Sequence, residues 1–541
     1  MRSDAASGNA MASFLMGIPE SGSVPINAPP AFTSLYYVVF VQDDWRVSKT
    51  LTLNLGLRWD YESPMSERYN QQNRGFDFTS PSPLKVPGLD LKGGLLFTDS
   101  NNRLPYKRDL NNIQPRIGVA WQFFAKTVLR AGYGVSYFPT FSPAYMNGFS
   151  TSTPYVASYD GGITPGPNRL RNPYPTGIQM PVGRAQGLST MLGQSFTFAN
   201  PERTIPKVHT FSLGFERALP WRSVFEISYV GTRSKEIETS KGMNEVTAAQ
   251  LAQYGANLAT AVPNPFAGLL PGTSINGATV QRQQLLRPFP QFLGITQARN
   301  PVGLGWYNAM QMRWEKRLSG GFHFLLSYTF SKTMEAASYL NAQDPLDQPA
   351  RAITDNDAPH RLILSGGWQL PVFRNTRGWR GAMFGGWKMN GIAVFQSGLS
   401  LAAPAGYYSS GVNPALPADK RTMTRYFNTC TLTTAGVRQN CASADEPVAF
   451  IQQPPYTLRT LGLRIASIRD QRPLNVDFSL FKAVPVSERV RLELRAESFN
   501  LLNSPWFGSP STALNTANAG LVTASQTNDP RNVQLALRLV F

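Results

Sequence analysis

The sequence is most constrained by an alternation of apolar and polar residues with a period of two. Residues 50–62, TLTLNLGLRWDYE, place leucines and aromatic residues at odd positions from 51 to 61. The even positions hold Thr52, Asn54, Gly56, Arg58, Asp60 and Glu62. Successive side chains of a β-strand point to opposite faces, so this segment is predicted to be a strand with one apolar and one polar face.

The same alternation returns at intervals through the chain, as in residues 129–137, 322–331 and 533–541. In residues 490–497 the polar face carries Arg491, Glu493, Arg495 and Glu497 in succession. Four charges of mixed sign suit a face bathed in water better than the core of a soluble protein. A single strand of this kind is common in soluble sheets, but the repetition favours a membrane barrel.

Thirteen strands are predicted, most of 11 to 13 residues. A tilted strand crosses a bilayer in ~9–11 residues, and interfacial ends account for the rest. The first strand is unusual because both of its faces mix apolar and polar residues. The predicted strands cover residues 36–47, 50–62, 114–125, 126–138, 207–218, 222–233, 305–317, 321–332, 358–370, 384–397, 473–483, 488–501 and 530–541.

The predicted connections alternate between short and long. The short ones are 48–49, 125–126, 219–221, 318–320 and 484–487, with 371–383 somewhat longer. The long ones, rich in Pro, Gly, Ser and Asn, are 63–113, 139–206, 234–304, 334–357, 398–472 and 502–529. Outer-membrane barrels have short periplasmic turns and long extracellular loops, whereas a soluble sandwich or propeller has even turns and blade-like repeats. The fold class is therefore predicted as an all-β, transmembrane antiparallel outer-membrane β-barrel.

Composition supports this interpretation. The 541-residue chain is only 16% charged, against about 25% in average soluble chains. Its longest apolar stretches, such as Tyr36–Val41, are far shorter than the ~20 residues of a transmembrane helix. The net charge of +18 is spread singly, without a basic run, so we expect no nucleic-acid partner and assign the charge to solvated surfaces.

The strand count predicts a partial barrel. If the chain ends in the periplasm, an odd number of strands places its start outside the cell, whereas bacterial single-chain barrels have an even number. Plugged transporters have about 22 strands, which leaves about nine unaccounted for. Residues 1–35 are then the remnant of an extracellular loop, and 36–541 the C-terminal part of the barrel. The first 22 residues are not a convincing signal peptide, because Gly17 and Pro19 break their apolar core.

Several blocks resemble, in order, the Oar-like family of TonB-dependent receptors. They lie at residues 40–64, 110–121, 129–139, 307–334, 357–371, 385–398, 494–510 and 532–541, and include FVQDDWRVSKTLTLNLGLRWDYESP and LRAESFNLLNSPWFGSP. The resemblance implies a signal peptide, a carboxypeptidase-regulatory-like domain and a plug domain upstream of the barrel, none of which lies in this sequence. It also implies a Gram-negative outer-membrane location, membrane lipid as surroundings, a plug and the TonB complex as partners, and an extracellular ligand. Without a plug, this polypeptide alone should not perform energised transport.

A set of charged residues is predicted to face the lumen of the barrel. In a plugged barrel they would hydrogen-bond the plug; the alternative is that they only pair across strands. The set comprises Arg58, Asp60, Arg130, Glu216, Glu226, Arg313, Glu315, Arg491, Glu493, Arg495, Glu497 and Arg538.

No catalytic or cofactor site is expected. HExxH, GxSxG and P-loop patterns do not occur. The histidines, His209, His323 and His360, are interpreted as polar side chains on strands. Asp355 and Asp357 could hold calcium, but a loop entering a strand explains them better. Cys430 and Cys441, in a polar turn-rich stretch, are predicted to close an exposed loop by a disulfide, with two free thiols as the alternative.

Two functions from different classes follow. The first is the barrel portion of an outer-membrane TonB-dependent transporter for an unidentified ligand. The second is a passive porin or adhesion-type surface barrel that is complete as written, and a non-functional gene remnant also fits the pattern. A plug sequence in frame upstream of Met1 separates the transporter from the other two.

Overall fold

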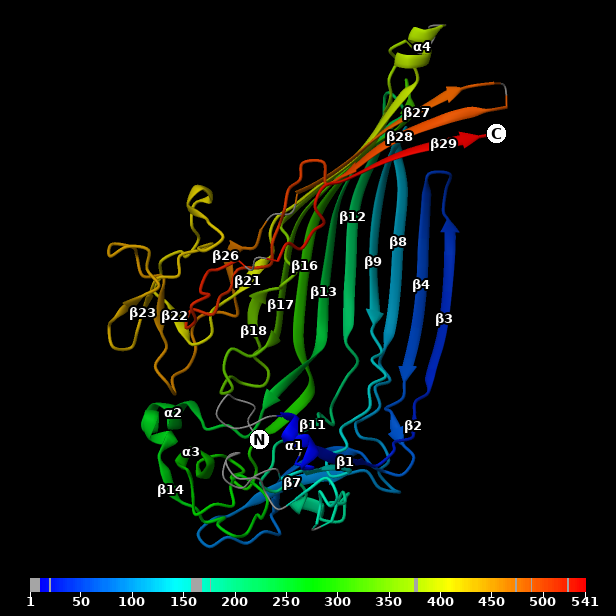
Figure 1. Ribbon diagram of the computed structural model, residues 1–541. Coiled ribbons are helices and arrows are strands. Elements are labelled where there is room, and N and C mark those ends of the chain that lie inside the picture. Colours follow the sequence, from blue (N-terminus) through cyan, green and yellow to red (C-terminus); the bar gives the residue numbers. More distant parts are fainter. Residues whose placement is uncertain are drawn as a thin grey trace.

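The computed structural model describes residues 10–18, 21–156, 168–175, 177–373, 378–471, 474–487, 489–522 and 525–541. Its main feature is a large sheet in which thirteen strands follow one another along a single path, each antiparallel to its neighbours (Figure 1). The number and order of these strands agree with the prediction. They are β3 (Tyr36–Arg46), β4 (Leu51–Glu62), β8 (Ile113–Phe124), β9 (Thr127–Tyr137), β12 (Lys207–Leu219), β13 (Ser223–Gly242), β16 (Ile295–Ser319), β17 (Phe322–Ser338), β19 (His360–Gln369), β20 (Trp387–Gln396), β27 (Leu474–Pro485), β28 (Arg491–Phe499) and β29 (Asn532–Val540).

The short turns gather at one end of the sheet and the long connections at the other (Figure 1). Two of the short turns contain two consecutive residues with left-handed backbone, a conformation that suits the twist of paired strands. Gly320 and Gly321 have φ of 64° and 79°, as expected of glycine, but Trp221 and Arg222 adopt 58° and 57° without it. The short and long connections predicted from the sequence thus correspond to the two opposite ends of the sheet.

Three strands run well past the predicted boundaries at the long-connection end. β13 continues to Gly242 instead of ending at 233, β16 begins at Ile295 instead of 305, and β17 continues to Ser338 instead of 332. Beyond the membrane both faces of a strand meet water or loops, so the alternation fades although pairing persists. The β13–β16 register shifts between Ser234 and Ile237 and again between Thr239 and Lys241.

Smaller differences occur at the other end. The strand predicted from 384 begins at Trp387, because helix α4 (Trp379–Phe384) occupies the turn before it. Pro473 and Glu488, the expected first residues of two strands, lie outside the described residues, as does the centre of the 371–383 connection.

The long connections, although rich in Pro, Gly, Ser and Asn, contain regular structure. They form short elements: α1 (Ala10–Leu15), β1 (Ser23–Asn27), β2 (Phe32–Thr33), β5 (Ser66–Glu67), β6 (Asn73–Pro81), β7 (Lys92–Phe97), β10 (Ser150–Pro154), η1 (Gly187–Ser189), β11 (Phe196–Ala199), α2 (Ala248–Tyr254), η2 (Gly255–Ala259), β14 (Ala261–Pro263), β15 (Thr279–Gln281), α3 (Arg282–Leu285), β18 (Ala350–Ile353), β21 (Ser400–Ala402), β22 (Tyr407–Ser409), η3 (Ala418–Lys420), β23 (Thr431–Leu432), β24 (Arg438–Gln439), β25 (Phe450–Gln452) and β26 (Arg464–Arg469).

These connections also have hydrophobic cores of their own. One, here called the phenylalanine core, consists of Phe76, Leu95, Phe196, Phe198, Phe289, Phe292 and Ile295. Another, the second loop core, consists of Leu401, Tyr407, Phe427, Ala449, Phe450, Ile468 and Leu514. Each core joins residues from connections far apart in sequence. Their apolar residues are dispersed among turns, so no periodic pattern revealed them.

The described parts of residues 1–35 lie with the long connections, where β1 pairs with β10 and β2 with β5 (Figure 1). Among the described residues, no helix has the length and apolar character needed to cross a bilayer. At the sheet edges, β3 pairs only with β4 and β29 only with β28 within the described part of the chain. The sheet is therefore open rather than closed into a ring.

Candidate functional site: the polar face of the sheet and its rim

The strand register divides the sheet into an apolar face and a polar face. Residues paired directly across antiparallel strands share a face. Leu213 pairs with Tyr229, which pairs with Met310, and that residue pairs with Phe330, so one face is apolar across four strands. On β29 the side chains of this face are largely bare, with Leu535 81% exposed. Such exposure of large apolar residues marks a surface that is covered by lipid in the membrane.

On the polar face, β3 and β4 meet in a small charged group. The Arg58 Nε lies 2.7 Å from the Asp60 Oδ1, and the Tyr36 hydroxyl donates to the Asp60 Oδ2 at 2.6 Å. The Arg58 Nη2 also donates to the Tyr36 hydroxyl at 3.3 Å. Asp60 is buried beneath these partners, whereas Arg58 remains partly accessible.

Most of the remaining predicted charges form further pairs on the same face. Most join residues two apart on one strand: Arg313–Glu315 at 2.5 Å, Arg491–Glu493 at 3.0 Å and Arg495–Glu497 at 3.8 Å. Arg130–Glu216, at 3.4 Å, joins neighbouring strands. Glu226 lies opposite both Glu216 and Arg313, and Arg538 lies opposite Glu493. The arginines are 50–59% exposed, and exposed pairs of this kind contribute only ~0–1 kcal/mol.

A hollow of about 640 Å³ lies over this charged surface near the short turns. Its lining includes Arg313, Glu315, His323, Ser365 and Asn390, which belong to four adjacent strands. It is an open depression with both charged and apolar lining residues, and not an enclosed pocket of the kind that holds a cofactor.

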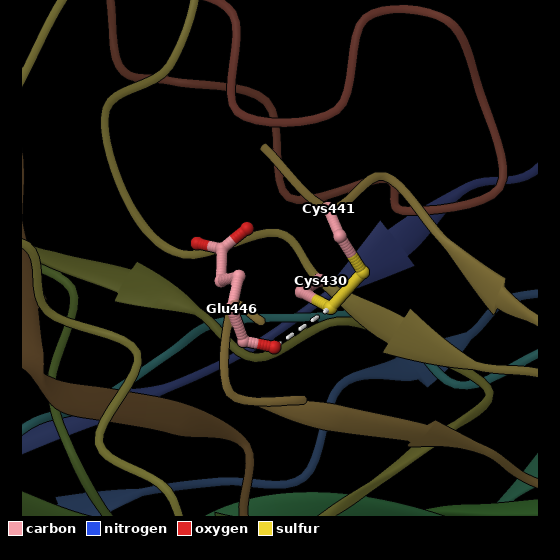
Figure 2. Close-up of side chains that lie close together, drawn as sticks. All are labelled: Cys430, Cys441 and Glu446. Carbon is pink, nitrogen blue, oxygen red and sulfur yellow. Dashed lines mark hydrogen bonds between the residues drawn. A yellow bond between two sulfur atoms is a disulfide. The ribbon is translucent and has the colours of Figure 1, made fainter. Parts of the chain in front are cut away.

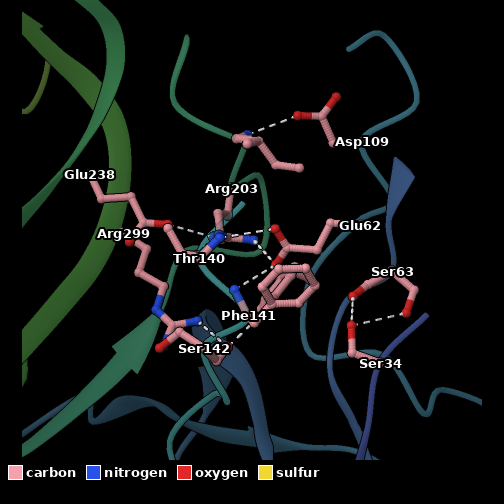
Figure 3. A network of polar contacts seen from close by, with 12 residues as sticks. Ser34, Glu62, Ser63, Asp109, Thr140, Phe141, Ser142, Arg203, Glu238 and Arg299 are labelled. Atoms are coloured by element: carbon pink, nitrogen blue, oxygen red, sulfur yellow. Dashed lines mark hydrogen bonds and ion pairs between the residues drawn. The ribbon is translucent and has the colours of Figure 1, made fainter. Parts of the chain in front are cut away.

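The rim at the long-connection end carries a buried ionic network around Arg203 (Figure 3). The Arg203 side chain is only 3% exposed; its Nε lies 2.5 Å from the Glu238 Oε1, its Nη2 contacts the Thr140 hydroxyl, and its Nη1 is 4.0 Å from the Glu62 Oε1. Glu62 in turn accepts the backbone N–H groups of Thr140 and Phe141, each at 3.0 Å. The network fastens the connection 139–206 to the ends of β4 and β13.

A second buried carboxylate, that of Asp357, likewise fastens a long connection to the sheet, on the other side of the rim. Asp357 is fully buried, with the Arg469 Nη2 at 2.6 Å and the Lys332 Nζ at 3.6 Å from its Oδ2. Its Oδ1 accepts the N–H of Thr333 at 2.7 Å. Asp355 instead faces Arg464 at 3.7 Å. Because the two aspartates bind different arginines, they form structural ion pairs rather than a shared calcium site.

Cys430 and Cys441 are joined by a disulfide in the connection 398–472, which also supplies most residues of the second loop core (Figure 2). The link spans the β23–β24 hairpin, and the Cys430 Sγ lies 3.8 Å from the main-chain oxygen of Glu446. The Glu446 carboxylate is engaged elsewhere, since it contacts Arg425 and accepts the N–H of Ala442 at 2.6 Å. This group is the only cluster with metal-ligand spacing within the described residues, and its sulfur atoms are covalently bound to each other.

The histidines lie on strands, as expected. His209 and His360 both belong to the apolar face near the long-connection end, and each hydrogen-bonds a tyrosine through its Nδ1: Tyr133 at 2.9 Å and Tyr328 at 2.8 Å. His323 lies on the polar face, opposite Gly367. None of the three belongs to a metal-ligating cluster among the described residues.

Sequence reasoning missed the rim residues Arg203, Glu238 and Arg469. They lie in predicted connections, where no periodicity assigns a face. The one available signal was the isolated charge itself, and such a charge is usually solvated.

Comparison with solved structures finds several outer-membrane receptors. The chain aligns with the ferripyoverdine receptor of Pseudomonas aeruginosa (8% identity, 94% of this chain, 39% of that chain, TM-score 0.40). It also aligns with the Escherichia coli K12 ferric-catecholate import receptor Fiu (10%, 94%, 45%, 0.38) and the E. coli outer-membrane transporter YddB (10%, 94%, 54%, 0.40). The chain spans between about two fifths and about half of the length of these structures. A comparison with curated protein sequences finds no match.

The family comparison is decisive for the fold. Residues 2–534 match the family described as outer membrane beta barrel domain, which is nearly the whole chain. The match agrees with the open antiparallel sheet, its apolar face and the division between short turns and long connections. The chain belongs to the outer-membrane β-barrel domain family, and its place is the outer membrane of a Gram-negative bacterium.

Proposed function

We propose that this chain forms part of the wall of a TonB-dependent outer-membrane transporter, with the polar face of its sheet lining the lumen. The observation that carries the proposal is the open thirteen-strand sheet. Barrels of about eight strands fill their interior with side chains, whereas about 22 strands enclose a lumen that holds a plug. A wall of thirteen strands that stays open belongs with the larger class.

The direction of the two edge strands supports this size. β3 runs toward the short-turn end, and so does β29 (Figure 1). Direct pairing of β3 with β29 would therefore be parallel, unlike every pair along the path. An antiparallel barrel needs an odd number of strands between them, and the nine strands that bring the total to 22 satisfy this condition. Residues 1–35 then belong to the extracellular loop before β3.

The polar face suits a removable plug. Its ion pairs are exposed and individually weak, so they can exchange one partner for another at little cost. A plug surface of mixed charge would bind such a wall without being locked to it. The ligand, which is unidentified, would approach from the long-connection end. We assign the chain no enzymatic activity and no cofactor.

A cross-linking experiment tests the wall. In the protein in its native outer membrane, cysteines at Val39 and Trp59, which are direct partners on β3 and β4, should form a disulfide. Cysteines at Val41 and Leu537, on the two edge strands, should not. Efficient cross-linking of the second pair within one molecule would mean that the thirteen strands close directly and would exclude a 22-stranded wall.

Conductance distinguishes transporter from porin. The native protein inserted in a planar bilayer should be silent if a plug fills the lumen, and ligand uptake in cells should stop when the proton gradient is collapsed. Steady ion conductance in the bilayer would identify a passive porin. Silence without gradient-dependent uptake would favour an adhesion-type surface barrel.

A further inference from the structure

We infer that the apolar face carries a binding site for the phosphate groups of a membrane lipid at the long-connection rim. The site consists of Lys207 on β12, Arg233 and Lys235 on β13, and Arg351 on β18, which we call the outer-rim basic patch. All four residues lie at the end of the apolar face that is nearest the long connections.

The strand register places these cations side by side. Lys207 is the direct partner of Lys235, and Arg233 is the direct partner of Trp306 on β16. The Arg351 guanidinium lies 5.1 Å from the centre of the Trp306 ring, which continues the patch onto β18. Like charges directly opposite each other destabilise a strand pair. The Lys207–Lys235 pair therefore calls for an anion nearby.

Within the part of the chain that the structure describes, Glu236 is the only carboxylate within 4.0 Å of these four cations, and Asp109 acts on Lys207 from a greater distance. Glu236 lies 2.5 Å from Lys207 and offsets that charge. Arg233 instead donates to neutral oxygens, those of the Thr232 and Tyr307 carbonyls and the Asn308 amide. Within the described residues, no carboxylate lies within 4.0 Å of Arg233, Lys235 or Arg351. Four cations and one carboxylate leave three positive charges without an acidic partner.

Two lysines at the opposite end of the apolar face donate, as Arg233 does, to main-chain carbonyls of the protein. The Lys316 Nζ donates to the Ser319 and Phe322 carbonyls, both at 2.9 Å, and the Lys482 Nζ donates to the Met383 and Gly385 carbonyls at 3.0 and 2.7 Å. The protein itself satisfies these ammonium groups. Lys235, by contrast, is exposed.

The depth of the patch in the membrane indicates which anion it binds. Strand β12 has 13 residues, and a barrel's apolar band is about 25 Å tall, so Lys207 at the outer end of β12 stands at headgroup depth. Tyr137 lies beside Lys207, and Tyr133 and Tyr229, on the same face, hydrogen-bond the neighbouring His209 and Asn308, as in the aromatic girdle of a membrane interface. A cation on a lipid-covered face meets headgroups and not bulk solvent. Phosphates of the outer-leaflet glycolipid fit this position, and Arg and Lys both bind phosphate well.

Native mass spectrometry of the whole protein, extracted in detergent and supplied with lipid A, tests the site. We expect the wild type to retain phosphorylated lipid A and to lose most of it in Arg233→Gln/Lys235→Gln, by roughly fivefold for each charge removed. Dephosphorylated lipid A should bind poorly to both. Lys332→Gln is the matched control, because Lys332 lies on the same face near the same rim but already faces Asp357.

Each outcome decides the question. Arg233→Lys should retain the lipid and shows that a loss in the double variant is not a folding defect. Equal retention by the double variant and the wild type, equal loss in the Lys332 control, or equal binding of dephosphorylated lipid A would overturn the inference. Displacement of the lipid by millimolar inorganic phosphate would show a site for free phosphate and would also overturn it.

Discussion

The sheet and the long connections, here called the loop layer, cover their apolar side chains in different ways. The two loop cores bury phenylalanines completely, as at Phe198, Phe292 and Phe427. The apolar face of the sheet leaves Leu55, Leu213 and Leu364 40–53% exposed. The loops therefore follow the rules of a soluble protein, in which side chains cover one another. The sheet follows the rules of a membrane protein, in which lipid does the covering.

The largest expected effect is in the loop layer. Phe292→Ala removes a fully buried ring from the phenylalanine core and should lower the free energy of unfolding of that region by ~3–5 kcal/mol. Hydrogen exchange followed by mass spectrometry should show faster exchange around Phe76 and Phe196. Phe330→Ala is the control, because that ring is 49% exposed on the apolar face and leaves no closed cavity. Similar losses in both variants would remove the distinction between the two regions.

A charge placed on the sheet should cost nearly as much, but only on one face. Leu55→Arg, near the middle of the apolar face of β4, should destabilise the protein in lipid vesicles by ~2–4 kcal/mol. Thr52→Arg, on the polar face of the same strand, should cost under ~1 kcal/mol. Urea unfolding of the two variants measures both values, and equal costs would refute the assignment of the faces.

The disulfide should stabilise only the connection that contains it, residues 398–472. Replacing Cys430 and Cys441 with serine removes a cross-link between residues 11 apart and should cost about 2–3 kcal/mol in local stability. Limited proteolysis should then cut near the β23–β24 hairpin, and a reductant should produce the same cuts in the wild type. New cuts near Phe76 would show that the two loop cores unfold together, contrary to this expectation.

The smallest effect concerns pH. The Ser80 hydroxyl and the backbone N–H groups of Ser80 and Thr79 donate to Asp77 and lower the pKa of its carboxyl from 3.8 to about 2. Because the pKa is lower in the folded state, the stabilisation is complete above pH 3.8 and disappears as the pH falls through about 2. Asp77→Asn should speed hydrogen exchange in β6 at pH 7, with the difference from wild type narrowing below pH 4. A constant difference would assign the effect to shape and not to charge.

The same contrast explains what the sequence could predict. A strand that separates lipid from water must alternate, so the thirteen strands and the shared face of Arg491, Glu493, Arg495 and Glu497 were accessible from residue order. The alternation did not reveal that these arginines pair with glutamates of their own strand. The loop cores obey no such rule. Phe292 and Phe76 are more than 200 residues apart, and only the folded connections bring them together. The extensions of β13, β16 and β17 were missed because their faces meet loops or water instead of lipid, so no alternation results.

Those extensions have a mechanical consequence. Beyond the membrane, β13, β16 and β17 continue side by side as one hydrogen-bonded ribbon, which should be stiff. Strand β11 pairs with β16 in this ribbon, and β18 pairs with β17. The loop layer is thus joined to the sheet through paired strands and not only through single connecting segments. A force applied to the loops should therefore bend this ribbon at the register shifts after Ser234 and Thr239, where strand pairing is interrupted, or twist the sheet itself.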